Sequence, residues 1–515
     1  MKRLPLGIQT FSHLMGNDYI YVDKTGFISR LIDSHKYAFL ARPRRFGKSL
    51  FLSTLEGFFL GNKELFSGLA LYDYPNWQKH PVIRLDFSDM ELSTLANFSE
   101  SLMDRFKEIA NEENLDVQSN IPSNYFSSLI KELYKKYNKG VVILVDEYDK
   151  PLTDHLYKTE IALSMRDFLQ SVFARIKASD EYIRFVFITG ISKFSKVSLF
   201  SGLNQMSDIS MNKEFGTLFG YTQTELKSYF GDRISILADE FGISNTELLQ
   251  KVKFWYNGYS WDGEEKLYNP FSILNFLKNG KFENYWFSTG TPSQLIKFIE
   301  NSKPGLDLFR NVTANYYTFD VDSLTNISAK NFLFQTGYLT IKEKKSIKGE
   351  EEFLLDFPNY EVQSSYFDYL FANAANRAAD DIKTKAKVLK DALEESDFTG
   401  FEEALRFLFA QIPSNLHIEQ ERFYHSLFIM IMYLSGIEVE AEVSTNIGRI
   451  DGVMEFPDKI YILEFKFNLP PEEGLKQILA KKYYEKYLSS GKKIFLVGVG
   501  FTRQDIKVSW FENNT

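Results

Sequence analysis

The chain has 515 residues, a length that typically forms several domains, and its 60 basic and 68 acidic residues give a net charge of −8. Apolar residues make up 44% and aromatic residues 16%, too much core-forming material for a disordered protein. The absence of cysteine excludes disulfides, thiol catalysis and cysteine-ligated metal centres. The acidic balance excludes a basic field over the whole molecule, so any contact with nucleic acid has to be local.

The chain shows no sign of a membrane or export segment. The N-terminal sequence MKRLPLGIQTF has basic residues without the apolar stretch that follows them in a signal peptide. The longest apolar run, Leu427–Leu434, is far too short to span a bilayer. These features predict a cytoplasmic protein.

Residues 1–220 alternate between short apolar runs and longer helical patterns. The runs are apolar at nearly every position, which is typical of strands whose two faces are both covered by helices. The alternation predicts a parallel α/β sheet. The predicted strands are Tyr37–Ala41, Pro81–Asp86, Val141–Val145 and Ile183–Thr189.

The pattern changes after residue 220. Amphipathic helical segments predominate in residues 221–410, so we predict a mostly helical middle region there, with a hairpin or loop at the polar stretch Lys342–Glu351. Residues 411–515 return to an α/β pattern and predict a separate small domain. Its elements are a helix at 419–435, strands at 438–443, 449–455, 460–467 and 493–499, and a helix at 471–488.

The segment Arg42–Ser49, RPRRFGKS, follows a predicted strand and opens a predicted helix, which is the setting of a phosphate-binding P-loop. Backbone N–H groups would cradle the phosphates, Lys48 would reach the β- and γ-phosphates, and Ser49 would bind Mg²⁺. Arg42 stands where the first glycine of the motif is usual, and a chance GKS in a basic turn is the alternative. The nucleotide-binding candidates here are Arg45, Phe46, Gly47, Lys48 and Ser49.

The second part of a nucleotide site is the apolar strand VVILV, which ends in Asp146 and Glu147. Asp146 would hold the Mg²⁺ shell and Glu147 would activate the attacking water, although an acidic loop after a strand is also common. Thr189 ends a later strand, where a polar residue can sense the γ-phosphate. Together with the loop these residues favour ATP binding. Hydrolysis stays open, because Arg166 and Arg175 are weak candidates for an arginine finger.

A second constellation lies near the C-terminus, where Asp451, Glu464 and Lys466 form the pattern D-x12-E-x-K. Glu464 and Lys466 are two residues apart on a predicted strand, so they share one face. A buried Glu and Lys there would be costly unless they were paired or bound to metal. The two carboxylates would hold Mg²⁺ for phosphodiester hydrolysis, and Lys466 would position water or stabilise charge. The alternative is a structural ion pair between Glu464 and Lys466.

Neighbouring helices offer further candidates for this second site. Glu421 could add a metal ligand, and Gln477 could orient the substrate or the lysine. The lysine- and tyrosine-rich segment 476–493 could contact a DNA backbone and bases, or could be the solvated face of an amphipathic helix.

Long motifs throughout the chain resemble the bacterial AAA-ATPase-like proteins that carry a C-terminal nuclease domain of the PD-(D/E)XK superfamily. The motifs include FLARPRRFGKSL, LVDEYDKP, FVFITGISKFSKVSLFSGLN, NYWFSTGTPS and ILEFKF. The resemblance implies an α/β P-loop NTPase core, a helical middle region and a restriction-endonuclease-like αβββαβ domain. It places the nuclease motif on Asp451, Glu464 and Lys466, and RPRRFGKS serves as the P-loop in that family. It also suggests that Tyr21, Asp23 or Lys24 lies near the nucleotide.

Two functions follow from these patterns. The first is an ATP-binding and ATP-hydrolysing protein coupled to an Mg²⁺-dependent DNA endonuclease, with RNA open as a substrate. The alternative is a nucleotide-dependent switch whose nuclease-like domain binds nucleic acid or a protein partner without cleavage. The oligomeric state stays open.

Overall fold

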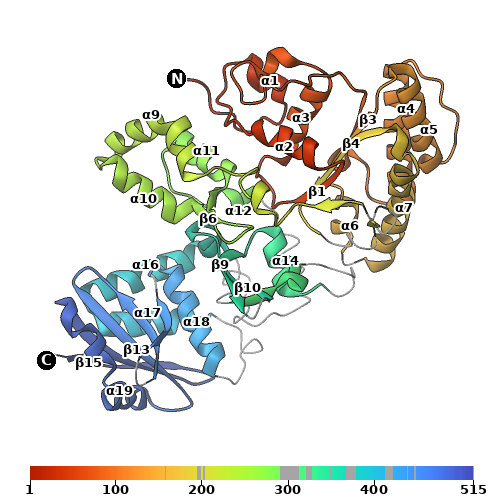
Figure 1. Cartoon of the computed structure of the whole chain (residues 1–515). Coiled ribbons are helices and arrows are strands. Elements are labelled where there is room, and N and C mark those ends of the chain that lie inside the picture. The colour runs from red at the N-terminus through yellow and green to blue at the C-terminus, as the bar shows by residue number, and fades with distance from the viewer. Residues whose placement is uncertain are drawn as a thin grey trace. The chain divides into compact units, whose positions relative to one another are not determined.

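The computed structural model of the chain describes most of its residues (Figure 1). These fall into two compact units, one formed by the described residues up to 362 and the other by those from 363 onward. The region 221–410 is therefore divided between the two units. The described residues are 1–156, 158–193, 199–200, 203, 205–289, 312–319, 327–347, 350–366, 379–411, 421–437, 439–445 and 448–513.

The N-terminal unit is built on a five-stranded, fully parallel sheet in the order β2-β3-β4-β1-β5. The four strands predicted from the apolar runs are confirmed, and β5 is an additional short strand. Their bounds are β1 Tyr37–Ala41, β2 Val82–Asp86, β3 Val141–Asp146, β4 Ile183–Gly190 and β5 Ser207–Asp208.

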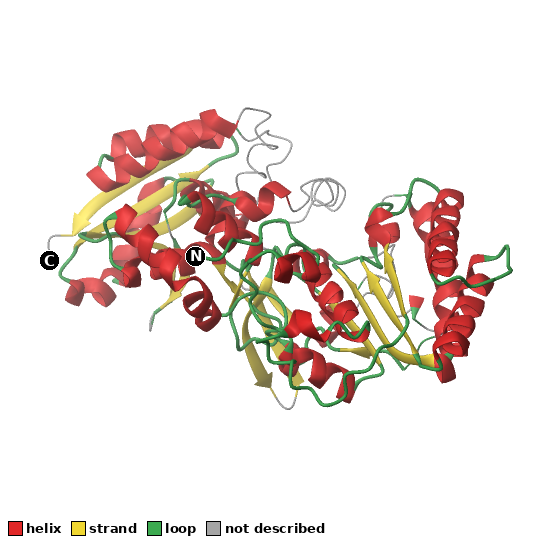
Figure 2. Ribbon diagram, turned by 90° about the horizontal axis from the view of Figure 1, so that it is seen from above, coloured by secondary structure: helices red, strands yellow, loops and turns green. Residues whose placement is uncertain are grey.

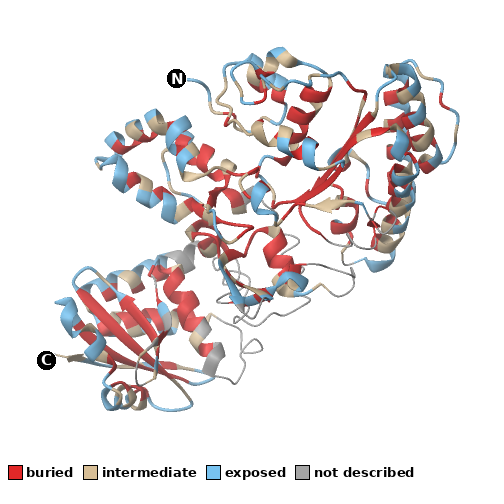
Figure 3. Cartoon of the chain, in the orientation of Figure 1, coloured by how far each residue is buried: buried red, intermediate tan, exposed pale blue. Residues whose placement is uncertain are grey.

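The central strands are buried because helices cover both faces of the sheet (Figures 2 and 3). Every residue of β1 and of β3 is buried, and so is every residue of β4 except Arg184. This burial explains why these strands are apolar on both faces. The helices around the sheet are α1 Phe11–Gly16, α2 Gly26–Ser34, α3 Lys48–Phe59, α4 Leu95–Glu112, α5 Pro122–Tyr137, α6 Lys150–Thr153 and α7 Thr159–Ala178.

The strand order decides which groups meet at the sheet edge. β4 lies between β1 and β3, whereas β2, which comes between β1 and β3 in the sequence, is the edge strand beyond β3. The carboxyl ends of parallel strands meet at one edge of a sheet. The segments after β1 and β3, which begin at Arg42 and Glu147, therefore emerge at the same edge with one strand between them.

The rest of the N-terminal unit is helical and also contains two small antiparallel sheets. Thr222 begins α9 with a capping box, in which its hydroxyl and the Glu225 carboxylate satisfy each other's backbone N–H groups. The helices are α9 Gln223–Phe241, α10 Asn245–Tyr256, α11 Pro270–Asn279, α12 Tyr285–Thr289 and α14 Ala329–Thr336. The strands are β6 Asn257–Tyr259 with β7 Leu267–Tyr268, and β8 Val312–Asn315 with β10 Glu350–Asp356 and β9 Thr340–Ile347. The β9–β10 hairpin is the one predicted at 342–351.

The C-terminal unit has a five-stranded sheet in the order β11-β12-β13-β14-β15. Only β13 and β14 are parallel, because α19 connects them. The predicted αβββαβ order is confirmed, followed by one further strand. The strands are β11 Glu440–Ser444, β12 Arg449–Glu455, β13 Lys459–Phe467, β14 Lys493–Phe501 and β15 Ile506–Asn513, and the helices are α16 Ala379–Glu395, α17 Phe398–Ala410, α18 Glu421–Leu434 and α19 Pro471–Ala480.

The helix α19 is shorter than the helix predicted at 471–488, and it packs closely on the sheet. It ends at Ala480, because Lys482 adopts a left-handed conformation (φ 47°) and a 3-10 helix, η8 Tyr483–Ser490, follows. It also lies very close to the sheet. A Cβ on Gly474 would approach the Glu464 carbonyl oxygen to 2.8 Å, and a Cβ on Gly498 would collide with the Pro471 carbonyl. Glycine at both positions therefore permits the close approach.

None of the described helices is long and apolar enough to cross a membrane.

The Glu361 carboxylate is completely buried in the N-terminal unit. Glu361 accepts hydrogen bonds from the backbone N–H of Trp286 (2.7 Å) and from the Ser272 hydroxyl (2.8 Å). The indole N–H of Trp286 in turn donates to the carbonyl of Arg44 (3.2 Å). Glu361 thus supports the residue that holds the loop after β1. Burial raises the pKa of Glu361 to about 7.

We expect Glu361 to make the stability of the N-terminal unit depend on pH. Its pKa is raised in the folded state, so its contribution is complete below its ordinary pKa of 4.5 and is lost as the pH rises through about 7. At about 1.4 kcal/mol per pH unit, wild type should lose roughly 2–3 kcal/mol relative to Glu361→Gln between pH 5 and pH 8. Calorimetric unfolding of both proteins across this range measures the difference. The exposed Glu350→Gln is the control, and a difference that does not change with pH would contradict the expectation.

Candidate functional site

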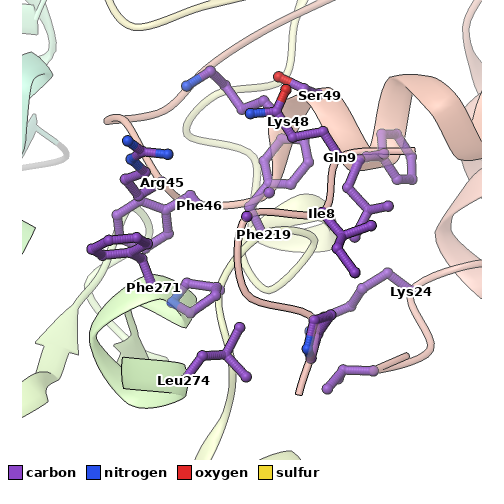
Figure 4. A pocket seen from close by; sticks show the side chains of 18 of the residues that line it. Ile8, Gln9, Lys24, Arg45, Phe46, Lys48, Ser49, Phe219, Phe271 and Leu274 are labelled. Atoms are coloured by element: carbon purple, nitrogen blue, oxygen red, sulfur yellow. The ribbon is translucent and has the colours of Figure 1, made fainter. Parts of the chain in front are cut away.

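A cavity of about 480 Å³ opens at the carboxyl edge of the N-terminal sheet. Figure 4 shows side chains from distant parts of the chain around it: Ile8 and Lys24 before the sheet, Lys48 at the start of α3, Phe219 after β5, and Phe271 and Leu274 on α11. Glu147, directly after β3, also lines it. The cavity therefore brings together the loop after β1 and an acid after β3, as the strand order requires.

The loop between β1 and α3 ends in a glycine with a positive φ. Gly47 has a φ of 95° directly before α3, a conformation that glycine adopts readily and other residues rarely do. A side chain at Gly47 would enter open space, so the backbone here is accessible to a ligand. Phe46 is buried and packs edge-on against Tyr259 (4.8 Å) and Trp261 (5.1 Å), which anchors the loop. The N-terminus of α3 then faces the cavity, where it favours anions.

Lys48 is buried at the base of the loop. Its Nζ donates hydrogen bonds to the carbonyls of Arg42 (3.0 Å) and Pro43 (3.1 Å). Burial lowers the pKa of Lys48, while the nearby carboxylates of Asp146 and Glu147 oppose this shift. A phosphate could replace the two neutral carbonyls as a stronger, charged acceptor.

Asp146 is fully buried beside Ser49. Its Oδ1 accepts the backbone N–H of Glu147 (3.0 Å), and Ser49 lies near enough to its carboxylate to lower the pKa of Asp146 against the effect of burial. No described residue donates a hydrogen bond to Oδ2, and burial raises the pKa of Asp146. A buried carboxylate oxygen without a partner, next to a hydroxyl, fits the oxygen ligands that Mg²⁺ prefers. Ser49 and Asp146 are therefore the residues that would hold the ion.

The remaining predicted nucleotide residues differ in their positions. Glu147 lines the cavity in a left-handed conformation (φ 47°), and burial raises its pKa. Thr189 is buried, donates its hydroxyl hydrogen to the Leu40 carbonyl (2.7 Å) and does not line the cavity. Arg45 lines the cavity and lies over the Phe271 ring (4.9 Å). Arg166 pairs with a neighbouring acid, and neither it nor Arg175 lines the cavity.

Arg42, which stands where the first glycine of the motif is usual, does not line the cavity. Its guanidinium is buried behind the loop, 4.2 Å from the Trp261 ring centroid. One of its nitrogens donates to the carbonyls of Ala41 (2.9 Å) and Ser210 (2.6 Å). Arg42 therefore supports the loop from the side away from the cavity, and its side chain occupies space that a glycine would leave empty.

The far end of the cavity is more apolar. Tyr21 and Lys24 line it, whereas the Asp23 carboxylate accepts hydrogen bonds from Thr25 and from the Ala70 backbone instead. Five of the residues that line the cavity here were not identified in the sequence analysis. They come from an N-terminal segment and from segments more than 200 positions after it. They share no spacing pattern, so only the fold brings them together; they are Ile8, Gln9, Phe219, Phe271 and Leu274.

In the C-terminal unit, Asp451 and Glu464 lie near each other on neighbouring strands. The β12–β13 ladder ends at the pair Gly452–Leu463, and Asp451 and Glu464 are the residues directly beyond it on the two strands. At this point the Asp451 carboxylate accepts the backbone N–H of Phe465 (2.8 Å). His425 on α18 hydrogen-bonds to the Asp451 carbonyl (2.9 Å). The Asp451 side chain is thus held across the strand pair, beside Glu464.

Glu464 has only 2% of its side chain exposed. Its Oε1 accepts hydrogen bonds from Lys466 Nζ (3.2 Å) and from the Gln477 amide on α19. No described residue donates to its Oε2. Burial, together with the charge of Asp451, raises the pKa of Glu464 to about 7. The structure therefore brings together Asp451, Glu464, Lys466 and Gln477.

The free Oε2 and the adjacent Asp451 fit a divalent cation, which takes carboxylate oxygens. Within the part of the chain that the structure describes, no group of three or more His, Asp or Glu side chains is gathered to hold a metal. The site thus offers a pair of carboxylates. Glu421 begins α18, but its side chain lies outside the described residues.

Most of the lysine- and tyrosine-rich segment 476–493 serves the fold and the solvated surface. Tyr483 is buried and donates its hydroxyl hydrogen to the Arg449 carbonyl (2.8 Å). Lys476, Lys482 and Lys492 pair with nearby glutamates. These residues form core and surface ion pairs.

Comparisons with known proteins agree with this division of the chain. Residues 5–200 match the family described as predicted AAA-ATPase, and residues 419–511 match the PD-(D/E)XK nuclease superfamily. The whole chain is similar to an "uncharacterized protein in vnfD 5'region" of Azotobacter chroococcum mcd 1. The two are 37% identical over 523 aligned positions, which cover 99% of this chain and 98% of that protein.

We expect Glu464→Gln to stabilise the C-terminal unit in the absence of divalent metal. The substitution removes a buried charge with an unpartnered oxygen, so the free energy of opening should rise by about 1–2 kcal/mol at pH 8. Hydrogen exchange of β13 and β14 peptides in EDTA, followed by mass spectrometry, measures this change. Glu455→Gln on the exposed end of β12 is the control and should stay within about 0.5 kcal/mol of wild type. Faster exchange in Glu464→Gln would show that the carboxylate is a structural partner instead.

Proposed function

Because the chain belongs to the family of predicted AAA-ATPases that carry a PD-(D/E)XK nuclease superfamily domain, we propose that it is an ATP-dependent, Mg²⁺-dependent DNA endonuclease. The observation that carries this proposal is the pair Asp451 and Glu464, which lie together directly beyond the last pair of the β12–β13 ladder, with Lys466 Nζ 3.2 Å from Glu464 Oε1. Burying this group without a ligand is costly, and metal-dependent phosphodiester hydrolysis supplies a reason for it.

At the ATP site, the N–H groups of Arg45, Phe46 and Gly47 and the start of α3 bind the phosphates. Lys48 leaves the carbonyls of Arg42 and Pro43 and neutralises phosphate charge. Bound Mg²⁺, held by Ser49 and Asp146, would supply further charge neutralisation. Glu147 lines the cavity and accepts a proton from the attacking water; its raised pKa is consistent with a base poised nearer to neutral pH.

At the nuclease site, Asp451 and Glu464 would hold Mg²⁺, which polarises the scissile phosphate and favours hydroxide formation. Lys466 orients the attacking water or stabilises the negative charge that develops on the phosphate. Gln477 fixes the orientation of Glu464 through its amide hydrogen bond. His425 and the Phe465 N–H hold Asp451 from its backbone and side-chain ends.

A second candidate is a slow nucleotide switch whose nuclease-like domain binds nucleic acid without cleavage. One observation favours it: the arginines that line the cavity, Arg44 and Arg45, both belong to the phosphate loop itself. No other described arginine lines the cavity, so the finger that accelerates hydrolysis would come from a partner or a second copy.

Two variants separate the two sites. Lys48→Ala should lose ATP binding, because it removes the cation at the phosphates. Glu464→Ala should reduce plasmid cleavage at least about 100-fold while it retains ATP hydrolysis, because the carboxylate pair is broken. The measurement is incubation of purified full-length protein with supercoiled plasmid and Mg²⁺, with and without ATP, beside ATP turnover of each variant.

The outcomes distinguish the two functions. Cleavage that depends on ATP and is absent from Glu464→Ala supports the coupled nuclease. Retention of one nucleotide per chain, with DNA binding but no cleavage by wild type, supports the switch. Equal cleavage by Glu464→Ala and wild type would show that the site is assigned wrongly.

A further inference from the structure

Lys481 lies beside the carboxylate pair although it is not part of the D-x12-E-x-K pattern. Its backbone N–H donates to the Gln477 carbonyl (3.0 Å), so the two residues are one helical turn apart. Residues four positions apart lie on the same face of a helix. Gln477 contacts Glu464 from this face of α19, so Lys481 lies on the side of α19 that faces the site.

The ammonium group of Lys481 lies over the start of β12. A Cβ placed on Gly448 would be 3.2 Å from Lys481 Nζ and 2.9 Å from the Tyr483 hydroxyl. Gly448 directly precedes β12 and lies three residues before Asp451, a span of about 10 Å in extended chain. The positive charge of Lys481 also acts on Glu464, where it favours the ionised form and lowers the pKa against the effect of burial.

Lys481 differs from the neighbouring lysines, which form ion pairs with glutamates. Lys476 pairs with Glu473 (2.6 Å) and Lys482 with Glu485 (3.4 Å), and both are largely exposed. Among the described residues, the Lys481 ammonium group has no ion pair with an acid, and it lies 5.8 Å from the centroid of the Tyr483 ring. It is also only half-exposed. Its ammonium group is therefore free to bind an anion at the edge of the carboxylate site.

We propose that Lys481 binds a phosphate of the DNA strand next to the scissile phosphodiester, as a second fixed cation of the nuclease site besides Lys466. This inference rests on the proposed nuclease function and adds a substrate contact to it. Lys466 is already bonded to Glu464, whereas the Lys481 ammonium group has no such acceptor. The absence of a side chain at Gly448 leaves the space in which Lys481 and Tyr483 lie close to the strand.

The test compares Lys481→Ala and Lys481→Arg with the matched control Lys476→Ala, all in the full-length protein. Lys476 lies on the same helix and its removal changes the net charge equally, but it is exposed and ion-paired. The measurements are kcat and KM for plasmid cleavage in Mg²⁺, and DNA affinity as a function of salt in Ca²⁺ without cleavage.

Removal of one phosphate contact should lower kcat/KM about 10-fold or more, and should reduce the slope of log affinity against log salt by about 0.7–0.9. Lys481→Arg should retain most of both values, because it keeps the charge. A purely structural role would not change the salt slope.

If wild type cleaves DNA and Lys481→Ala matches Lys476→Ala in kcat/KM and in salt slope, Lys481 makes no phosphate contact and the proposal is overturned, while the nuclease assignment stands. If wild type does not cleave DNA, the proposed function fails, and DNA binding alone then tests the Lys481 contact. In that case an unchanged salt slope in Lys481→Ala, or no DNA binding by wild type, overturns the proposal.

Discussion

Both candidate sites depend on the same constraint, a buried carboxylate with one oxygen that no described residue satisfies. Asp146 Oδ2 and Glu464 Oε2 are these atoms, and each lies near a lysine, Lys48 in one unit and Lys466 in the other. Leaving such groups in a protein interior costs free energy unless they are paired or bind a ligand. The fold therefore maintains two sites at which a bound cation would compensate the unsatisfied carboxylate oxygen. The surrounding helices and loops hold these carboxylates in place.

The two units hold their carboxylates by different means. In the N-terminal unit the parallel sheet brings the ends of β1 and β3 to one edge, and β4 separates them by one strand. In the C-terminal unit Asp451 and Glu464 directly follow the last pair of the antiparallel β12–β13 ladder, Gly452 with Leu463. The close approach of α19 at Gly474 and Gly498 then brings Gln477 onto Glu464. The strands β12 and β13 thus bring Asp451 and Glu464 together, and the close packing of α19 at the two glycines adds Gln477.

The loop between β1 and α3, residues 42–47, is held by contacts on its side away from the cavity as well as by its own turn. Phe46 packs against Tyr259 and Trp261, and Trp286 donates to the Arg44 carbonyl. These aromatic residues come from beyond the parallel sheet but belong to the same compact unit. The arrangement explains how an arginine can replace the first glycine of the motif: Arg42 fills the space behind the loop and stacks on Trp261. Through Trp286, the same arrangement connects the loop at the cavity to the buried Glu361 carboxylate.

The sequence by itself determined the strands and pointed to the candidate site residues, because continuous apolar runs and fixed spacings are local properties. It predicted β1 to β4, the αβββαβ order, and the roles of Lys48, Ser49, Asp146, Asp451, Glu464 and Lys466 as candidates. It did not determine the position of Thr189, whose hydroxyl bonds to Leu40, or the orientation of Arg42. The tertiary structure alone decided the apolar end of the cavity, where Ile8, Phe219 and Phe271 meet, and the place of Lys481 beside Glu464. These contacts join segments far apart in the chain, and no spacing records them, because they arise only when helices pack onto sheets.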